Sequence, residues 1–234
     1  MAMESDSSDA PPPFDASVQL LAASYSTSTE VGTYQGAIPS LMYQVGRVSF
    51  GGAMGLYRIN ENGLDASGIG DVMAHVGVQI FHQGEFTVGG IAMVSAPTGD
   101  EKVGLGMGHP MAMPSIYGAW THERVTVSAS AGYSRALADV PQGHDHGVWP
   151  LVEPMNMSEV TWSAGAEVAM GRGVVGGVRM AGGHPFELMG HERVVGALRL
   201  GWGSGRIDTA AEVQTGFVGD PYTVRGLVET GLHF

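Results

Sequence analysis

Methionine and histidine side chains gather in three segments of the sequence, and this mixture of ligands suits copper. The segments contain, in chain order, Met107, His109, Met111 and Met113, then His144, His146, Met155 and Met157, and finally His184, Met189 and His191. They hold five of the nine His and six of the 14 Met. Thioether sulfur favours Cu(I), whereas imidazole also accepts Cu(II) or zinc. If the fold brings the three segments together, we expect them to form a copper-binding site.

A purely structural role is the competing interpretation of the same residues. Methionine commonly fills gaps in a protein interior, and a histidine in a loop is often simply solvated. No single segment contains a complete set of ligands, and the absence of cysteine argues against a tight structural zinc site. The sequence therefore requires no cofactor, and copper is the metal that its residues suggest.

The elements that would position these residues are β-strands. Between Arg124 and Tyr133, apolar Val125 and Val127 alternate with Thr126 and Ser128. A period of two indicates a strand with one apolar and one polar face. The pattern recurs in about twelve segments of roughly ten residues, which is the length that a tilted strand needs to cross the hydrocarbon layer.

The connections between these segments distinguish a membrane barrel from a soluble sandwich. Short links such as Gly46-Arg47 and Gly171-Arg172 alternate with longer ones, at about 26–33, 59–68, 96–110, 136–157, 181–192 and 218–221. Such alternation is typical of an up-and-down outer-membrane barrel, with turns at the periplasmic rim and loops at the other. We therefore predict an all-β fold, an antiparallel transmembrane β-barrel of about 12 strands. Residues 16–234 would form it, after a flexible leader of residues 1–15 that is rich in Ser, Asp and Pro.

Charged side chains fall on or beside the polar faces of the predicted strands, where they would line the lumen of the barrel. Those that we expect there are Arg124, Glu159, Glu167, Arg206, Asp208, Glu212, Arg225 and Glu229. Mixed charges can line a water-filled constriction, or they can pair across the lumen and plug it. The sequence leaves both arrangements open.

Composition and motifs argue against two functional classes. The formal net charge of -12 disfavours nucleic acid as a partner and favours cations. Neither of the two His-Glu-Arg sequences, at 122–124 and 191–193, continues to the second histidine of a zinc protease. No Gly-x-Ser-x-Gly nucleophile motif occurs either. We expect that the protein is not an enzyme.

The ends of the predicted strands carry two further indications of a bacterial outer membrane. The last alternating segment closes on Phe234, which resembles the terminal signal that the barrel insertion machinery recognises. Several aromatic residues, among them Tyr25, Tyr34, Trp162 and Tyr222, lie near strand ends, where a girdle at the lipid headgroups is expected. The expected partners are therefore outer-membrane lipids and the insertion machinery.

Two motifs resemble the outer-membrane family named for the meta-cleavage pathway of phenol degradation. The first is Gly68-Ile69-Gly70-Asp71, at the opening of a predicted strand, and the second is Pro97-Thr98-Gly99-Asp100, at the exit of the next. Members of that family typically carry Gly-Leu-Gly-Asp and Pro-Thr-Gly-Asp in this order. The resemblance implies a barrel transporter or channel for small, often hydrophobic compounds.

Together these observations predict a channel or transporter for a small solute or metal ion, with Met- and His-rich extracellular loops that bind copper. Passage of small hydrophobic or aromatic compounds is the alternative with the same fold. A closed structural barrel without transport is the alternative from a different class.

Overall fold

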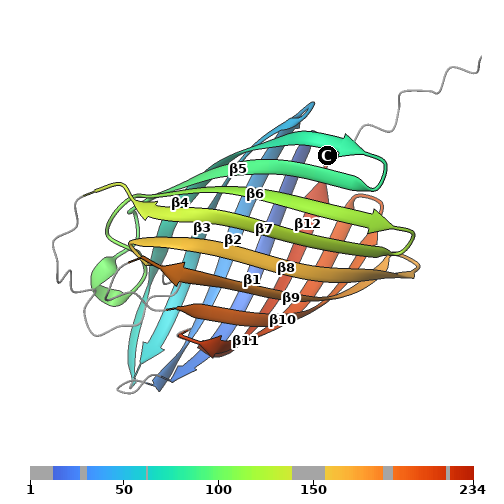
Figure 1. Ribbon diagram of the computed structural model, residues 1–234. Coiled ribbons are helices and arrows are strands. Elements are labelled where there is room, and N and C mark those ends of the chain that lie inside the picture. Colours follow the sequence, from blue (N-terminus) through green and yellow to red (C-terminus); the bar gives the residue numbers. More distant parts are fainter. Residues whose placement is uncertain (1–12, 27–30, 62, 139–155, 187–191, 220–221) are drawn as a thin grey trace, which may run out of the picture.

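Twelve antiparallel strands close into a single barrel in the computed structural model, and this confirms the predicted fold (Figure 1). The structure describes residues 13–26, 31–61, 63–138, 156–186, 192–219 and 222–234. Each strand pairs with its neighbours in sequence, and β1 pairs with β12 to complete the barrel. The strands are β1 (Phe14–Ser26), β2 (Val31–Val45), β3 (Val48–Glu61), β4 (Leu64–Gln83), β5 (Phe86–Ala96), β6 (Met111–His122), β7 (Val125–Ala136), β8 (Ser158–Gly171), β9 (Val174–Pro185), β10 (Arg193–Ser204), β11 (Ile207–Val218) and β12 (Tyr222–His233).

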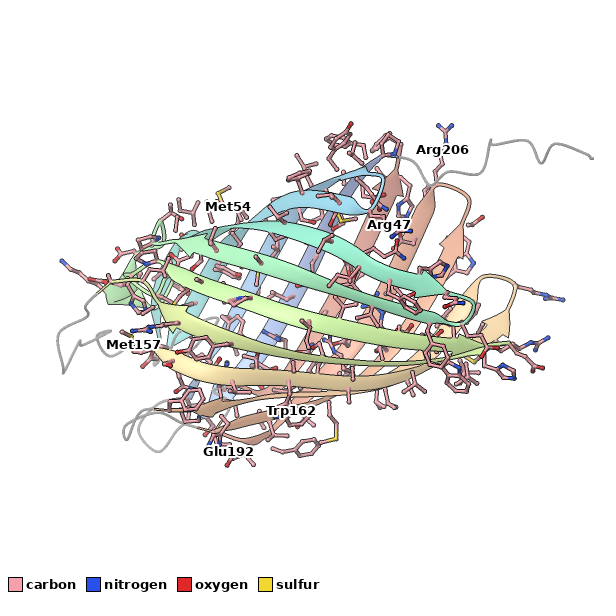
Figure 2. The ribbon with its side chains drawn as sticks, turned by 45° about the horizontal axis from the view of Figure 1, so that its top comes forward. Arg47, Met54, Met157, Trp162, Glu192 and Arg206 are labelled. Carbon is pink, nitrogen blue, oxygen red and sulfur yellow. The ribbon has the colours of Figure 1, made fainter. Side chains whose placement is uncertain are left out.

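The outer face of the barrel is apolar along most of its height. Ile116 is 63% exposed and Leu198 66%, although both lie in the middle of their strands. Figure 2 shows Met54 and Trp162 at different places around the barrel, both on its outer face. A face like this is stable only against another apolar surface, which for a closed barrel is the hydrocarbon of a bilayer. Within the described residues, no helix is both long and apolar enough to span a membrane.

At one end of the barrel lie five two-residue turns, the beginning of β1 and the end of β12. We name it the short-turn end. At Gly46, Gly84 and Gly205 the first turn residue has a φ of 57°, 57° and 62°, the left-handed region that glycine adopts without strain. The β6–β7 turn places Glu123 at φ 49° instead, and Arg172 has a φ of 53° in the β8–β9 turn. We name the opposite end, where β5 and β7 end and β6 and β8 begin, the long-loop end.

One predicted loop is wrong. The segment 59–68 is not a long link, because β3 and β4 remain paired as far as Glu61 and Leu64. On the outer surface of this extension the Asp65 carboxylate accepts hydrogen bonds from Arg58 at 3.1 Å and Asn60 at 2.9 Å. These polar residues resemble a loop in sequence, yet in the structure they bond across the hairpin and lengthen it.

The aromatic residues divide between the two faces of the barrel. Trp120, Trp162 and Trp202 are exposed on the outside, as a girdle requires. At the short-turn end Trp120 donates a hydrogen bond of 2.9 Å to Glu85 in the adjoining turn. The hydrogen bond from His122, together with that from Trp120, holds the pKa of the Glu85 carboxyl below its usual range.

Three tyrosines that we assigned to the girdle point into the barrel instead. Tyr25, Tyr34 and Tyr222 are each less than 5% exposed. They pack near the long-loop end in a cluster whose other members are Leu21, Ala23, Tyr57, Ile59, Leu105 and Leu227. These side chains form an apolar, largely aromatic cluster on the inner wall of β1, β2, β3 and β12, with Leu105 of the β5–β6 loop packed against it.

Candidate solute path through the barrel

The two motifs that resembled a known family bind one another in the structure. The Asp71 carboxylate accepts hydrogen bonds from the backbone N–H groups of Gly99, at 3.0 Å, and Met107, at 2.8 Å. The Thr98 hydroxyl donates to the Gly70 carbonyl and accepts from the Val72 N–H, both at 2.9 Å. These four bonds hold the β5–β6 loop, residues 97–110, against the inner wall of β4.

Glycine is required where this loop meets its anchor. A Cβ atom at Gly106 would lie 2.5 Å from an Asp71 carboxylate oxygen, and one at Gly99 would lie 2.3 Å from the Leu105 carbonyl oxygen. Either approach is too close for any side chain. The loop also buries Leu105, which is 4% exposed and packs in the aromatic cluster. The β5–β6 loop thus folds into the long-loop end of the barrel and packs against that cluster.

A tyrosine ring covers part of the inner wall nearby. Tyr57 lies over Gly36, Gly55 and Gly70, where a Cβ atom would approach the ring to 2.5, 2.1 and 2.6 Å. These glycines of β2, β3 and β4 therefore let a large aromatic ring lie against the inner wall of a narrow barrel.

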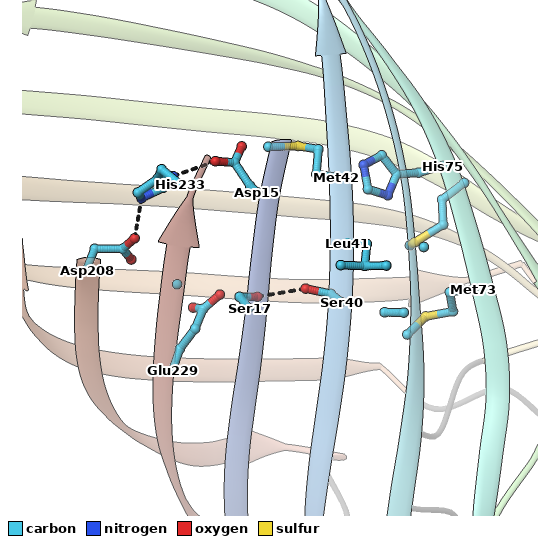
Figure 3. A pocket seen from close by; sticks show the side chains of 14 residues that line it. Asp15, Ser17, Ser40, Leu41, Met42, Met73, His75, Asp208, Glu229 and His233 are labelled. Atoms are coloured by element: carbon cyan, nitrogen blue, oxygen red, sulfur yellow. Dashed lines mark hydrogen bonds and ion pairs between the residues drawn. The ribbon is translucent and has the colours of Figure 1, made fainter. Parts of the chain in front are cut away.

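Toward the short-turn end, the lumen contains a cavity of about 340 Å³. Figure 3 shows that its two sides differ in chemistry. Met42, Met73, His75 and Met93 line one side, whereas Asp15, Asp208, Glu229 and His233 line the other. On the polar side His233 bonds to Asp15 and to Asp208, each at 2.5 Å.

The predicted copper ligands are distributed over several environments. Met107, His109 and Met111 are buried inside the long-loop end, each at most 5% exposed, and Met113 follows Met111 on β6. Met157 immediately precedes β8, while His184, near the end of β9, lies 3.7 Å from Glu192. His144, His146, Met155, Met189 and His191 lie outside the described residues. Within the described part of the chain, no group of three His, Cys, Asp or Glu side chains could hold a metal ion.

Three of the eight residues predicted to line the lumen form ion pairs with arginines on the wall formed by β8 to β12. Glu159, which has no exposed surface, pairs with Arg193 and accepts from Asn156. Glu212 lies 2.9 Å from Arg179 and 3.7 Å from Arg199, and Arg199 lies 3.8 Å from Glu229.

The remaining predicted residues continue this wall or lie at its edge. Arg225 donates to Gln214 at 2.8 Å, and Asp208 bonds to His233. Glu167 lies directly opposite Thr126 and Gly177 in the strand register, near the short-turn end. Arg124 and Arg206 are turn residues at the short-turn end. Among the described residues, the ion pairs of these carboxylates and arginines run along the wall formed by β8 to β12.

The sequence interpretation did not include Met42, Met73, His75 and Met93 among the site residues, although all four line the cavity. The alternation could have placed each of them on an inner face. Their proximity to one another depends on the register of four strands, which the sequence does not reveal.

The fold and this divided lumen define the class of protein, a β-barrel of the outer-membrane type. A family model described as "Putative MetA-pathway of phenol degradation" matches residues 2–146, more than half of the chain. The chain therefore belongs to this family. A search of curated proteins finds no match.

Three solved structures illustrate how widely the fold is shared. An outer membrane channel from Pseudomonas putida F1 superposes with a TM-score of 0.76 at 12% identity, covering 99% of this chain and 100% of that one. The KdgM porin in complex with oligogalacturonate gives 0.60 at 8% identity, covering 94% and 99%. The CymD monoaromatic hydrocarbon channel gives 0.53 at 9% identity, covering 96% and 89%. At these identities the likeness establishes the fold.

Proposed function

We propose that this protein is a non-enzymatic channel of the bacterial outer membrane that conducts small solutes. The observation that carries the proposal is the Asp71 anchor, which holds the β5–β6 loop against the inner wall of a barrel that also contains an internal cavity. A barrel that served only as a structural element would need neither a cavity nor a loop held at its closed end. The structure then corresponds to a closed conformation, in which release of the loop opens the path.

Small hydrophobic or aromatic compounds are the solutes that we favour. Methionines line one side of the cavity and tyrosines fill the lumen beyond it. Flexible thioether side chains adapt to varied apolar ligands. The cavity volume of about 340 Å³ is at the small end of the range for ligand sites. Membership of a family named for phenol degradation, and the fold shared with a monoaromatic hydrocarbon channel, agree with this choice.

Copper capture at the long-loop end is the second candidate. The observation in its favour is that Met107, His109 and Met111, each at most 5% exposed, all lie inside that end of the barrel. In this version the barrel would take up metal through the same closed region. Titration of Cu(I) into a variant that replaces these three residues, compared with the unaltered protein, tests it directly, because equal binding would remove the mouth as a copper site.

The channel proposal is tested by releasing the loop. Asp71→Asn removes the charge and one acceptor from the anchor, so we expect larger or more frequent conductance events in planar lipid bilayers than for the unaltered protein. Uptake of a small aromatic probe into proteoliposomes should rise in parallel. Asp65→Asn is the matched control, because Asp65 is a carboxylate on the same strand that faces outward. If neither protein conducts ions nor admits the probe, the barrel is a closed structural element.

A further inference from the structure

A single row of inward-facing residues crosses seven strands at the level of the cavity. Starting from β12, direct strand partners along the row are His233, Asp15, Met42, Gly51, His75, Met93 and Met113. Side chains of direct partners have Cβ atoms about 4.5–5.5 Å apart. The row therefore changes from charged groups on β12 and β1 to thioethers and an imidazole on β2, β4, β5 and β6.

Gly51, the glycine of this row, leaves room for the imidazole of His75. A Cβ atom at Gly51 would lie 2.3 Å from Cε1 and 2.7 Å from Nε2 of His75, so the imidazole occupies the space above β3. It thereby extends from β4 toward Met42 on β2, while Met93 is its direct partner on β5. Met73, two residues before His75 on the same strand face, lines the same cavity (Figure 3).

Three thioethers and one imidazole that line one cavity form a ligand set of a particular kind. Soft sulfur ligands select Cu(I), and imidazole is compatible with it, whereas hard cations require oxygen ligands. The neighbouring carboxylate of Asp15, the direct partner of Met42, adds negative charge beside this set without belonging to it. We propose that Met42, Met73, His75 and Met93 form a binding site for a soft monovalent metal ion, Cu(I), inside the short-turn half of the lumen.

None of the four proposed ligands belongs to the predicted copper-binding mouth, although Met113 of that set is the direct strand partner of Met93. It does not depend on the proposed transport function, because binding can be measured in detergent without any flux. The competing explanation is that the methionines only provide an apolar wall for hydrophobic solutes. Replacement by leucine separates the two, since leucine preserves apolar volume and removes the sulfur.

The test uses the full chain folded in detergent and titrated with Ag(I) by calorimetry, and with Cu(I) in competition with a chromophoric chelator. The unaltered protein is expected to bind one ion saturably. The variant M42L/M73L/M93L is expected to lose this binding, and His75→Gln to weaken it. The matched control M54L/M170L/M180L removes the same number of thioethers from the outer face, where Met170 and Met180 are 55% and 47% exposed, and should bind as the unaltered protein does.

Altered mobility on a gel before and after boiling verifies that each variant is folded. X-ray absorption at the copper edge should show sulfur and nitrogen neighbours in the unaltered protein. The proposal is overturned if the unaltered protein binds neither ion, or if M42L/M73L/M93L binds as tightly as its control. Conductance measured on the unaltered protein and on M54L/M170L/M180L keeps the channel proposal separate, because these outer-face substitutions leave the residues that line the cavity unchanged.

Discussion

At the scale of single residues, the pair formed by Glu159 and Arg193 allows a quantitative prediction. Glu159 is completely buried in the barrel, and its carboxylate is bonded to Arg193 and Asn156. We expect Glu159→Ala to lower the free energy of unfolding by about 3–5 kcal/mol, because the substitution leaves a partly buried guanidinium without this counter-charge. Unfolding by guanidinium chloride in detergent micelles, followed by tryptophan fluorescence, measures the change.

The control for Glu159 is a pair on the outer surface. Arg58 and Asp65 are 65% and 49% exposed, so water screens this pair, and Asp65→Ala should lower the free energy of unfolding far less than Glu159→Ala does. Equal costs for the two substitutions would contradict the prediction. They would mean that water screens charges as well inside the barrel as on its surface.

The sequence predicted which residues alternate inward, but not which of them meet. The period of two placed Glu159, Glu212 and Glu229 on polar faces, and in the structure Glu159 pairs with Arg193 while Glu212 and Glu229 share Arg199. The same period is compatible with either face for an aromatic residue near a strand end. Tyr25 and Tyr222 were therefore assigned to the lipid girdle, although strand pairing turns both inward.

At the scale of elements, two substitutions in the short turns should change the free energy of unfolding in opposite directions. Glu123 has a φ of 49° in the β6–β7 turn, a conformation that costs residues other than glycine roughly 1–2 kcal/mol. Glu123→Gly should therefore stabilise the barrel by about 1 kcal/mol, partly offset by the greater entropy of glycine in the unfolded chain. Reversible unfolding in micelles provides the measurement.

Gly46 provides the reciprocal substitution in the β2–β3 turn. Its φ is 57°, and a Cβ atom there would have open space around it, so only the backbone conformation opposes a side chain. Gly46→Ala should destabilise the barrel by about 1 kcal/mol. A shift of the same sign for Gly46→Ala and Glu123→Gly would show that turn conformation does not govern stability at this end.

The connecting elements were predictable in their order but not in their shape. Five short turns were predicted within one or two residues, because tight hairpins require glycine or a polar residue at fixed positions. The 97–110 loop was expected as an extracellular link, whereas it folds inward. Its course depends on the bonds from Gly99 and Met107 to Asp71, and the sequence separation of 28 and 36 residues gives no local pattern for such contacts.

At the scale of the whole molecule, the division of the lumen follows from where the chain places its residue types. Methionine and tyrosine prevail on the inner faces of β1 to β6, and ionic pairs on those of β8 to β12. Closure of the barrel brings the two halves face to face at the seam between β1 and β12. The cavity is thus bounded by methionines and an imidazole on one side and by charged groups on the other.

The surroundings of the whole barrel can be tested at one position of its outer face. Leu198 lies in the middle of β10 and is 66% exposed. In a soluble protein, a charge at so exposed a site would change the free energy of unfolding by less than about 0.5 kcal/mol. If lipid surrounds the barrel, Leu198→Arg should cost about 2–4 kcal/mol, because arginine near the midplane must leave water.

Val45→Arg, at the short-turn end and 53% exposed, should cost only about 0–1 kcal/mol by the same dependence on depth. Unfolding of both variants from lipid bilayers measures the difference, and equal costs at the two depths would place the apolar face outside a membrane.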